Sequence, residues 1–124
     1  MSENRIKDFI AHRQDLNQKV MDTNHLGIKR FFNLDTAAYT EGILPANTKE
    51  LLGLTASMVL RCNDCIDYHI IQCIDAGYSD EELYEAMNVA LVVGGSIVIP
   101  HLRHAVESVI LYRDYCKEQS SLNE

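Results

Sequence analysis

The scarcity of proline is the feature that most limits what this chain can fold into. Its 124 residues contain two prolines and six glycines. A proline inside a helix removes a backbone hydrogen bond and costs about 3 kcal/mol, so prolines usually stand at helix ends. Here Pro45 stands just ahead of one stretch with helical patterning, and Pro100 opens another. The chain is therefore expected to form a small number of long, regular elements.

The spacing of apolar residues indicates that these elements are helices. Ile6, Phe9, Ile10 and Leu16 recur at about 3.6 positions, which is the period of an amphipathic helix. The same pattern, interrupted at polar or glycine-containing stretches, continues along the whole chain. The six predicted helices cover about residues 3–21, 28–39, 47–60, 62–76, 79–99 and 100–118.

Short polar motifs mark where several helices begin and end. Residues 47–50 and 79–82 both have the spacing of a capping box, in which Asn or Ser precedes Glu by three positions. Residues 62–64 interrupt an apolar run with good N-cap residues, so a new helix is expected to begin there. Gly77 has the position of a left-handed C-cap.

The longest apolar run, residues 89–99, is rich in β-branched residues, which favour strands. No partner strand is visible elsewhere, so we interpret the run as buried helix. It is about half as long as a membrane-spanning helix and contains Gly94 and Gly95. The charged first fifteen residues lack the apolar segment of a signal peptide. Residues 1–124 are thus predicted to form one all-α domain in the cytoplasm, with no membrane partner.

Charge and cysteine content narrow the classes of function. The formal net charge of −7 argues against nucleic acid or an anionic membrane as a partner. A chain of this length can bury a core without disulfide bonds. Because the cytoplasm keeps thiols reduced, the four cysteines are more consistent with catalysis, metal binding or simple burial than with a structural disulfide framework.

The segment RCNDCIDYHIIQC places Cys62, Cys65, His69 and Cys73 within thirteen positions. A shared metal ion is not expected, because Cys62 and Cys73 would lie about 16 Å apart along one helix. Cys73 and Cys116 have no partner at motif spacing and are interpreted as small core residues. No metal and no bound cofactor are therefore predicted.

The Cys62–Cys65 pair favours redox chemistry. Residues three apart on a helical turn have Cα atoms about 5 Å apart, within reach of a disulfide. A helix N-terminus favours the reactive thiolate. His69, one turn beyond Cys65, can serve as its base, although such a histidine is often structural. Glu50 likewise has two interpretations, as the last residue of a capping box or as part of the chemistry.

The stretch KELLGLTASMVLRCNDCIDYH resembles the signature of the carboxymuconolactone decarboxylase/alkyl hydroperoxidase D superfamily. That signature is a Glu, a Cys twelve positions later, and then Cys-x2-Cys-x3-His. Glu50, Cys62, Cys65 and His69 fit every interval. The resemblance covers about residues 44–107.

The resemblance implies an all-α, alkyl hydroperoxidase D-like bundle that assembles into homo-oligomers, with a hexamer built as a trimer of dimers expected. It also implies thiol peroxidase or disulfide oxidoreductase activity. In that activity Cys65 attacks a peroxide, Cys62 resolves the product as a disulfide, and Glu50 and His69 relay protons. An external dithiol, such as a lipoyl or thioredoxin-like protein, would then reduce the disulfide.

Asp64 departs from the family pattern, because the best-known peroxidase members have a second histidine at this position. An acid there opposes thiolate formation, and His101 or His104 would have to supply the missing imidazole. Two alternatives follow. The chain can be a redox-responsive oligomer without enzymatic turnover, or a decarboxylase or lactone-processing enzyme that uses Glu50 and His69 as acid and base.

Overall fold

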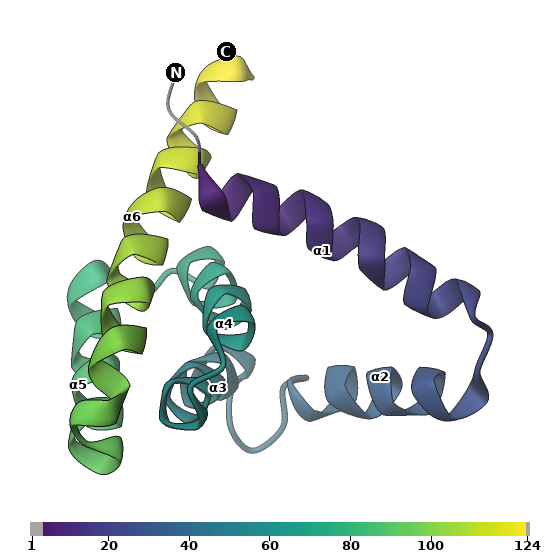
Figure 1. Cartoon of the computed structure of the whole chain (residues 1–124), viewed down its shortest axis with the longest axis horizontal. Coiled ribbons are helices and arrows are strands. Elements are labelled where there is room, and N and C mark those ends of the chain that lie inside the picture. The colour runs from purple at the N-terminus through teal and green to yellow at the C-terminus, as the bar shows by residue number, and fades with distance from the viewer. Residues whose placement is uncertain (1–3, 124) are drawn as a thin grey trace.

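The computed structural model describes residues 4–123, which form six α-helices, one short 3-10 helix and no β-strand (Figure 1). This confirms the predicted all-α bundle of about six helices. Within the described residues, no helix is both long enough and apolar enough to cross a membrane. The elements are α1 (Arg5–Asp22), α2 (Leu26–Ala38), α3 (Ala46–Leu60), α4 (Asn63–Asp75), α5 (Asp80–Gly94), η1 (Ser96–Val98) and α6 (Ile99–Leu122).

The helices divide into a packed bundle and an arm. Helices α3 to α6 pack against one another, whereas α1 leaves the bundle beside α6 and α2 turns back towards α3 (Figure 1). We call α1 and α2 together the arm. Ile6 is the one buried residue of α1, and α2 has none. The arm is therefore held mainly at its N-terminal end.

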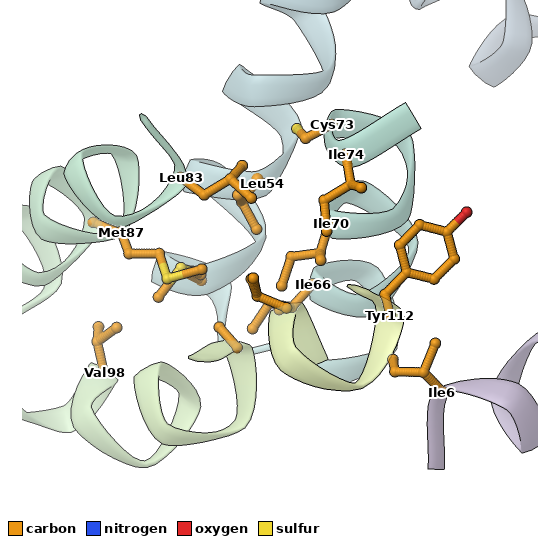
Figure 2. Packing of buried hydrophobic residues seen from close by; sticks show 14 residues of the cluster. Ile6, Leu54, Ile66, Ile70, Cys73, Ile74, Leu83, Met87, Val98 and Tyr112 are labelled. Carbon is orange, nitrogen blue, oxygen red and sulfur yellow. The ribbon is translucent and has the colours of Figure 1, made fainter. Parts of the chain in front are cut away.

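The core fills the space between the four bundle helices and the start of α1 (Figure 2). Fully burying a side chain of this kind contributes about 1.5–3 kcal/mol, so the bundle carries most of the stability of the chain. Ile6 reaches this core from α1. The largest fully buried side chains are Ile6, Leu54, Met58, Ile66, Ile70, Leu83, Met87, Val98, Val109 and Cys73.

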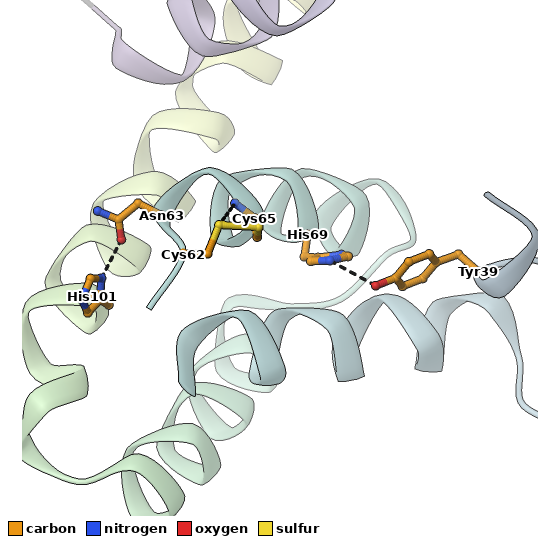
Figure 3. Close-up of a disulfide and its surroundings, with 6 residues drawn as sticks. All are labelled: Tyr39, Cys62, Asn63, Cys65, His69 and His101. Atoms are coloured by element: carbon orange, nitrogen blue, oxygen red, sulfur yellow. Dashed lines mark hydrogen bonds between the residues drawn. A yellow bond between two sulfur atoms is a disulfide. The ribbon is translucent and has the colours of Figure 1, made fainter. Parts of the chain in front are cut away.

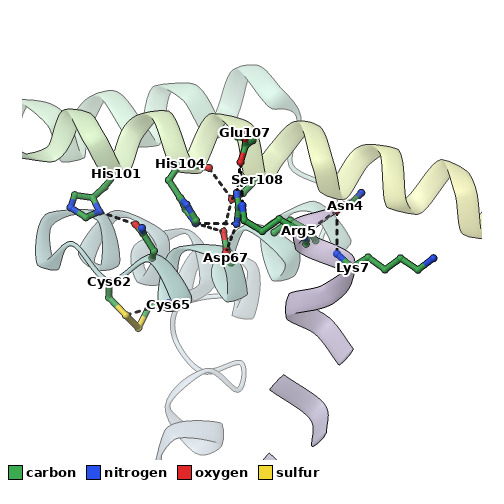
Figure 4. Close-up of polar contacts among 12 residues, drawn as sticks. Asn4, Arg5, Lys7, Cys62, Cys65, Asp67, His101, His104, Glu107 and Ser108 are labelled. Atoms are coloured by element: carbon green, nitrogen blue, oxygen red, sulfur yellow. Dashed lines mark hydrogen bonds and ion pairs between the residues drawn. A yellow bond between two sulfur atoms is a disulfide. The ribbon is translucent and has the colours of Figure 1, made fainter. Parts of the chain in front are cut away.

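A polar cluster fastens the arm to the bundle (Figure 4). The guanidinium of Arg5 donates to Asp67 of α4 at 2.9 Å and to Ser108 of α6 at 2.8 Å. His104 lies 3.0 Å from the same aspartate, and Glu107 pairs with Arg5 from the outer side. Because Asp67 and Ser108 are buried, each needs these partners to offset the loss of water.

The interpretation of residues 89–99 as continuous buried helix is wrong. Helix α5 ends at Gly94, Gly95 takes a positive φ of 82°, and a 3-10 turn follows. Ala90 and Val98 are buried, but Val92 and Val93 are 78% and 69% exposed. Gly95 ends the helix, since only glycine adopts such a φ without strain. The outer face of the run is therefore apolar surface.

The capping motifs have mixed outcomes. Ser79 and Glu82 form the predicted capping box at the start of α5, and Gly77 follows α4 with a positive φ of 101°. The box predicted at residues 47–50 is wrong, because α3 already begins at Ala46, with Pro45 as its N-cap residue. The side chain of Glu50 is consequently free for a tertiary contact.

Several large apolar side chains of α2 and α5 are left exposed within residues 4–123. Phe31 and Leu34 are 68% and 69% exposed. A helix with no buried residue gains little from its own fold, because most helical stability in proteins comes from packing an apolar face. Two such faces on one small chain suit a closed assembly of identical copies. We propose that other copies of this chain cover them.

The purified protein should therefore have several times the mass of its 14.1 kDa chain in light scattering, and six times for the expected hexamer. Leu34→Glu should dissociate the assembly, because it buries a charge in the interface. Asn33→Glu, at the neighbouring exposed position of the same helix, is the matched control and should leave the mass unchanged. A monomer at micromolar concentration would contradict the proposal.

Candidate active site

A tight turn places the Cys62–Cys65 pair at the N-terminus of α4. Arg61 ends α3 in the left-handed conformation with a φ of 62°, and the N–H of Cys62 donates to the carbonyl of Ser57 at 3.1 Å. Cys62 is the N-cap residue of α4, which confirms the predicted helix start. The Cα atoms of the two cysteines lie 5.3 Å apart and their sulfurs form a disulfide (Figure 3).

The two sulfurs have different surroundings. The Sγ of Cys62 accepts a hydrogen bond from the backbone N–H of Cys65 at 3.3 Å, as N-cap side chains do. Cys65 is exposed and lines a pocket of about 420 Å³ between the arm and α4. Because amide donors at a helix N-terminus favour the thiolate, Cys62 is suited to carry a negative charge. Cys65 is placed to meet a small molecule.

His69 and Glu50 form a nearly buried pair behind the disulfide. The Nδ1 of His69, on α4, lies 2.9 Å from Oε1 of Glu50, on α3, and the side chains are 9% and 13% exposed. A carboxylate only accepts hydrogen bonds, so Nδ1 is the donor. This contact fixes the ring orientation and leaves Nε2 as the acceptor nitrogen. Glu50 thus contacts His69 rather than the backbone at Asn47.

Gly53, which no sequence pattern indicated, makes room for this pair. It lies on α3, three residues after Glu50. A Cβ atom at this position would lie 2.5 Å from Cε1 and 2.7 Å from Nε2 of His69, distances too short for unbonded atoms. The imidazole therefore packs directly on the backbone of α3. Only glycine allows that approach.

Tyr39 is a second neighbour of His69 that sequence patterns did not indicate. It is the C-cap residue of α2, and its hydroxyl lies 3.3 Å from Nε2 of His69 (Figure 3). Tyr68, beside His69 on α4, packs edge-on against the same imidazole at 5.1 Å between ring centroids. Burial and the charges of Asp35 and Glu50 raise the pKa of Tyr39, so its phenol stays protonated at neutral pH.

The other candidate residues lie at the edges of the site. Asp64 is exposed and lines the pocket together with Cys65. Nδ1 of His101 lies 2.8 Å from Oδ1 of Asn63, the first residue of α4, and so reaches the same helix end from α6 (Figure 3). His104 is engaged with Asp67 in the cluster that holds the arm.

Cys73 and Cys116 do not line the pocket beside Cys65. Cys73 belongs to the core as predicted, and burial raises the pKa of its thiol to about 12, which keeps it protonated and unreactive. Cys116 is partly buried and packs against the core. Within residues 4–123, no three side chains of the metal-binding types are grouped closely enough to hold an ion.

Residues 28–108 match the model of the carboxymuconolactone decarboxylase family. Over 59 residues the chain is 32% identical to an uncharacterized protein of Cupriavidus necator. That alignment covers 48% of this chain and 52% of the other protein, so the chain spans about half the length of the curated relative it matches.

Solved structures share the fold over almost the whole chain. Two crystal structures of TM1620 from Thermotoga maritima are 55% and 54% identical, with TM-scores of 0.86 and 0.84. They cover 90% of this chain and 98% and 95% of theirs. One is described as a carboxymuconolactone decarboxylase family protein for which a role in an antioxidative response has been suggested. A family member from Legionella pneumophila is 23% identical, with a TM-score of 0.77 over 91% of this chain and 98% of its own.

Gly53→Ala tests the packing of His69. Replacing a glycine inside a helix ordinarily stabilises a protein by about 0.5–1 kcal/mol. Here we expect the free energy of unfolding to fall by about 1–3 kcal/mol, because the new methyl group overlaps the imidazole. Denaturant titration measures this. Gly27→Ala, in the exposed first turn of α2, is the control: its Cβ would meet only the exposed ring of His25, at 3.2 Å, so stability should stay level or rise by up to about 1 kcal/mol. A Gly53→Ala variant more stable than wild type would contradict the packing.

Proposed function

Given that this chain belongs to the carboxymuconolactone decarboxylase family, we propose that it is a thiol peroxidase or disulfide oxidoreductase acting through Cys62 and Cys65. One observation carries the proposal. A cysteine pair, close enough to form a disulfide and with Cys65 exposed, opens the helix that also carries His69, and His69 is hydrogen-bonded to the nearly buried carboxylate of Glu50. A nucleophile beside an oriented base is the arrangement that thiol catalysis needs.

Cys65 is the proposed attacking thiol. It lies one helical turn from His69, and both residues line the same pocket. Nε2 of His69 is the nitrogen that can take the thiol proton, directly or through one water, since Nδ1 is committed to Glu50. The resulting thiolate attacks the peroxide, and Cys65 becomes a sulfenic acid while the peroxide is reduced to an alcohol or to water.

Cys62 is the proposed resolving thiol. Its sulfur accepts the amide hydrogen bond of Cys65 at the helix N-terminus, a contact that favours a thiolate on Cys62. That thiolate attacks the sulfenic sulfur of Cys65, forms the Cys62–Cys65 disulfide and releases water. An external dithiol, such as a lipoyl or thioredoxin-like protein, would return the pair to the reduced state by thiol–disulfide exchange, with no bound cofactor. The cytoplasm would supply such donors.

Replacing each cysteine in turn tests these roles. Cys65→Ser should lose at least about 10²-fold in peroxide reduction, because the nucleophile is gone. Cys62→Ser should allow one round of oxidation and leave a sulfenic acid on Cys65 that a dimedone-type trap labels, as read by mass spectrometry. Cys116→Ser, remote from the site, is the control and should behave as wild type.

Three results would contradict the assigned cysteine roles or the proposed function. Labelling of Cys62 in Cys65→Ser, with no label in Cys62→Ser, would reverse the two roles. Absence of any label, in a wild-type protein that forms no disulfide with peroxide, would leave a redox-responsive oligomer without turnover. Activity on a lactone that survives loss of both cysteines would favour the acid–base alternative built on Glu50 and His69.

A further inference from the structure

Tyr39 and Tyr68 flank the imidazole of His69 but differ in their contacts with it. Their ring centroids lie 5.2 Å and 5.1 Å from that of His69, and both tyrosines line the pocket beside Cys65. Only Tyr39 is hydrogen-bonded to the imidazole, with its hydroxyl oxygen 3.3 Å from Nε2 (Figure 3). The ring of Tyr68 is instead covered by the guanidinium of Arg13, 4.3 Å from the ring centroid.

The direction of each hydrogen bond follows from the chemistry of the groups. Glu50 accepts from Nδ1 of His69, so Nε2 has the free lone pair of the neutral imidazole. The hydroxyl of Tyr39 is therefore the donor to Nε2. Glu50, His69 and Tyr39 form one hydrogen-bonded chain that runs from a nearly buried carboxylate to the wall of the pocket that Cys65 also lines.

We propose that Tyr39 is the acid that protonates the oxygen leaving the peroxide, a role that rests on the peroxidase function proposed above. When Nε2 of His69 takes the thiol proton of Cys65, the contact with Tyr39 reverses, and Nε2–H donates to the phenol oxygen. The hydroxyl proton of Tyr39 is then free to point into the pocket. No other side chain is hydrogen-bonded to Nε2 within residues 4–123.

The step balances without a further reagent. The thiolate of Cys65 attacks one oxygen of ROOH, so an S–O bond forms as the O–O bond breaks. The departing RO⁻ takes the hydroxyl proton of Tyr39, and His69 passes the proton that came from Cys65 on to the phenolate. The sum is Cys–SH plus ROOH giving Cys–SOH plus ROH, in which sulfur is oxidised and the peroxide is reduced.

Two properties of Tyr39 support this role. Burial and the neighbouring carboxylates of Asp35 and Glu50 raise its pKa, so the proton is present at neutral pH. An alkoxide or hydroxide is a stronger base than a phenolate, so the transfer is favourable once the O–O bond breaks. Tyr39 also stands at the end of α2, so the arm delivers the acid to a thiol held by the bundle.

The test compares leaving groups that need a proton with those that do not. Protein reduced with dithiothreitol and desalted is mixed, in single-turnover experiments, with hydrogen peroxide, peracetic acid or iodoacetamide. The leaving group of hydrogen peroxide is hydroxide, which needs a proton. The leaving groups of peracetic acid and iodoacetamide are acetate and iodide, which need none. Tyr39→Phe should slow the first reaction about 10²-fold and the other two less than about threefold. Tyr68→Phe, the matched control, should change all three less than about threefold.

Three results would overturn the role. Equal losses on all three reagents in Tyr39→Phe would mean that Tyr39 only positions His69. No loss on hydrogen peroxide, or the same selective loss in Tyr68→Phe, would mean that its hydroxyl carries no proton in the reaction. A wild-type protein that iodoacetamide alkylates but that reduces neither peroxide would remove the peroxidase function itself, and with it this role. Circular dichroism of each variant checks that the helices are intact.

Discussion

The hydrogen bond between Glu50 and His69 is the interaction on which the site depends. It joins α3 to α4 at 2.9 Å in a place where neither side chain has much access to water. A carboxylate in such surroundings requires a hydrogen-bond donor, and the imidazole supplies one. The contact orients the ring and leaves Nε2 available on the side where Tyr39 lies. Gly53 is part of the same arrangement, because a side chain there would occupy the space of the ring.

The site combines elements of unequal stability. The disulfide, His69 and Glu50 stand on bundle helices that share the core, so their relative positions are well fixed. Tyr39 stands on α2, which buries none of its own side chains in the single chain. The arm is fastened at its start by Arg5 and depends elsewhere on what covers its apolar face. Assembly of copies would therefore also fix the wall of the pocket opposite Cys65.

Much of the fold could be predicted from local signals. The start of α4 at Cys62, the capping box of α5 and the glycine after α4 are encoded by residues a few positions apart. The prediction of a continuous buried helix at residues 89–99 is wrong, because apolarity alone does not distinguish a side chain buried in the chain's own core from one exposed on its surface. The box at residues 47–50 failed for a related reason, since Pro45 already starts α3 and the carboxylate of Glu50 meets His69 instead.

Some residues of the candidate site could be predicted from the sequence, and others could not. The family signature has fixed spacing on two adjacent helices. It therefore indicates four site residues together: Glu50, Cys62, Cys65 and His69. Tyr39 and Gly53 have no such spacing to the cysteines. Tyr39 contacts His69 because the arm folds back over the bundle. Gly53 matters only because the imidazole of His69 lies against its backbone. Contacts of this kind depend on tertiary packing and leave no periodic trace in a sequence.

The pH dependence of thiol alkylation tests most directly whether the Glu50–His69 pair serves Cys65. The rate of reaction of reduced Cys65 with iodoacetamide is followed from pH 5 to 10 in wild type and in Glu50→Gln, which keeps the shape of the side chain but removes its charge. We predict that wild type stays reactive at and below neutral pH, and that Glu50→Gln reacts about 10²-fold more slowly there while unfolding at a similar denaturant concentration. Superimposable profiles for the two proteins would contradict the relay and leave Glu50 with a structural role alone.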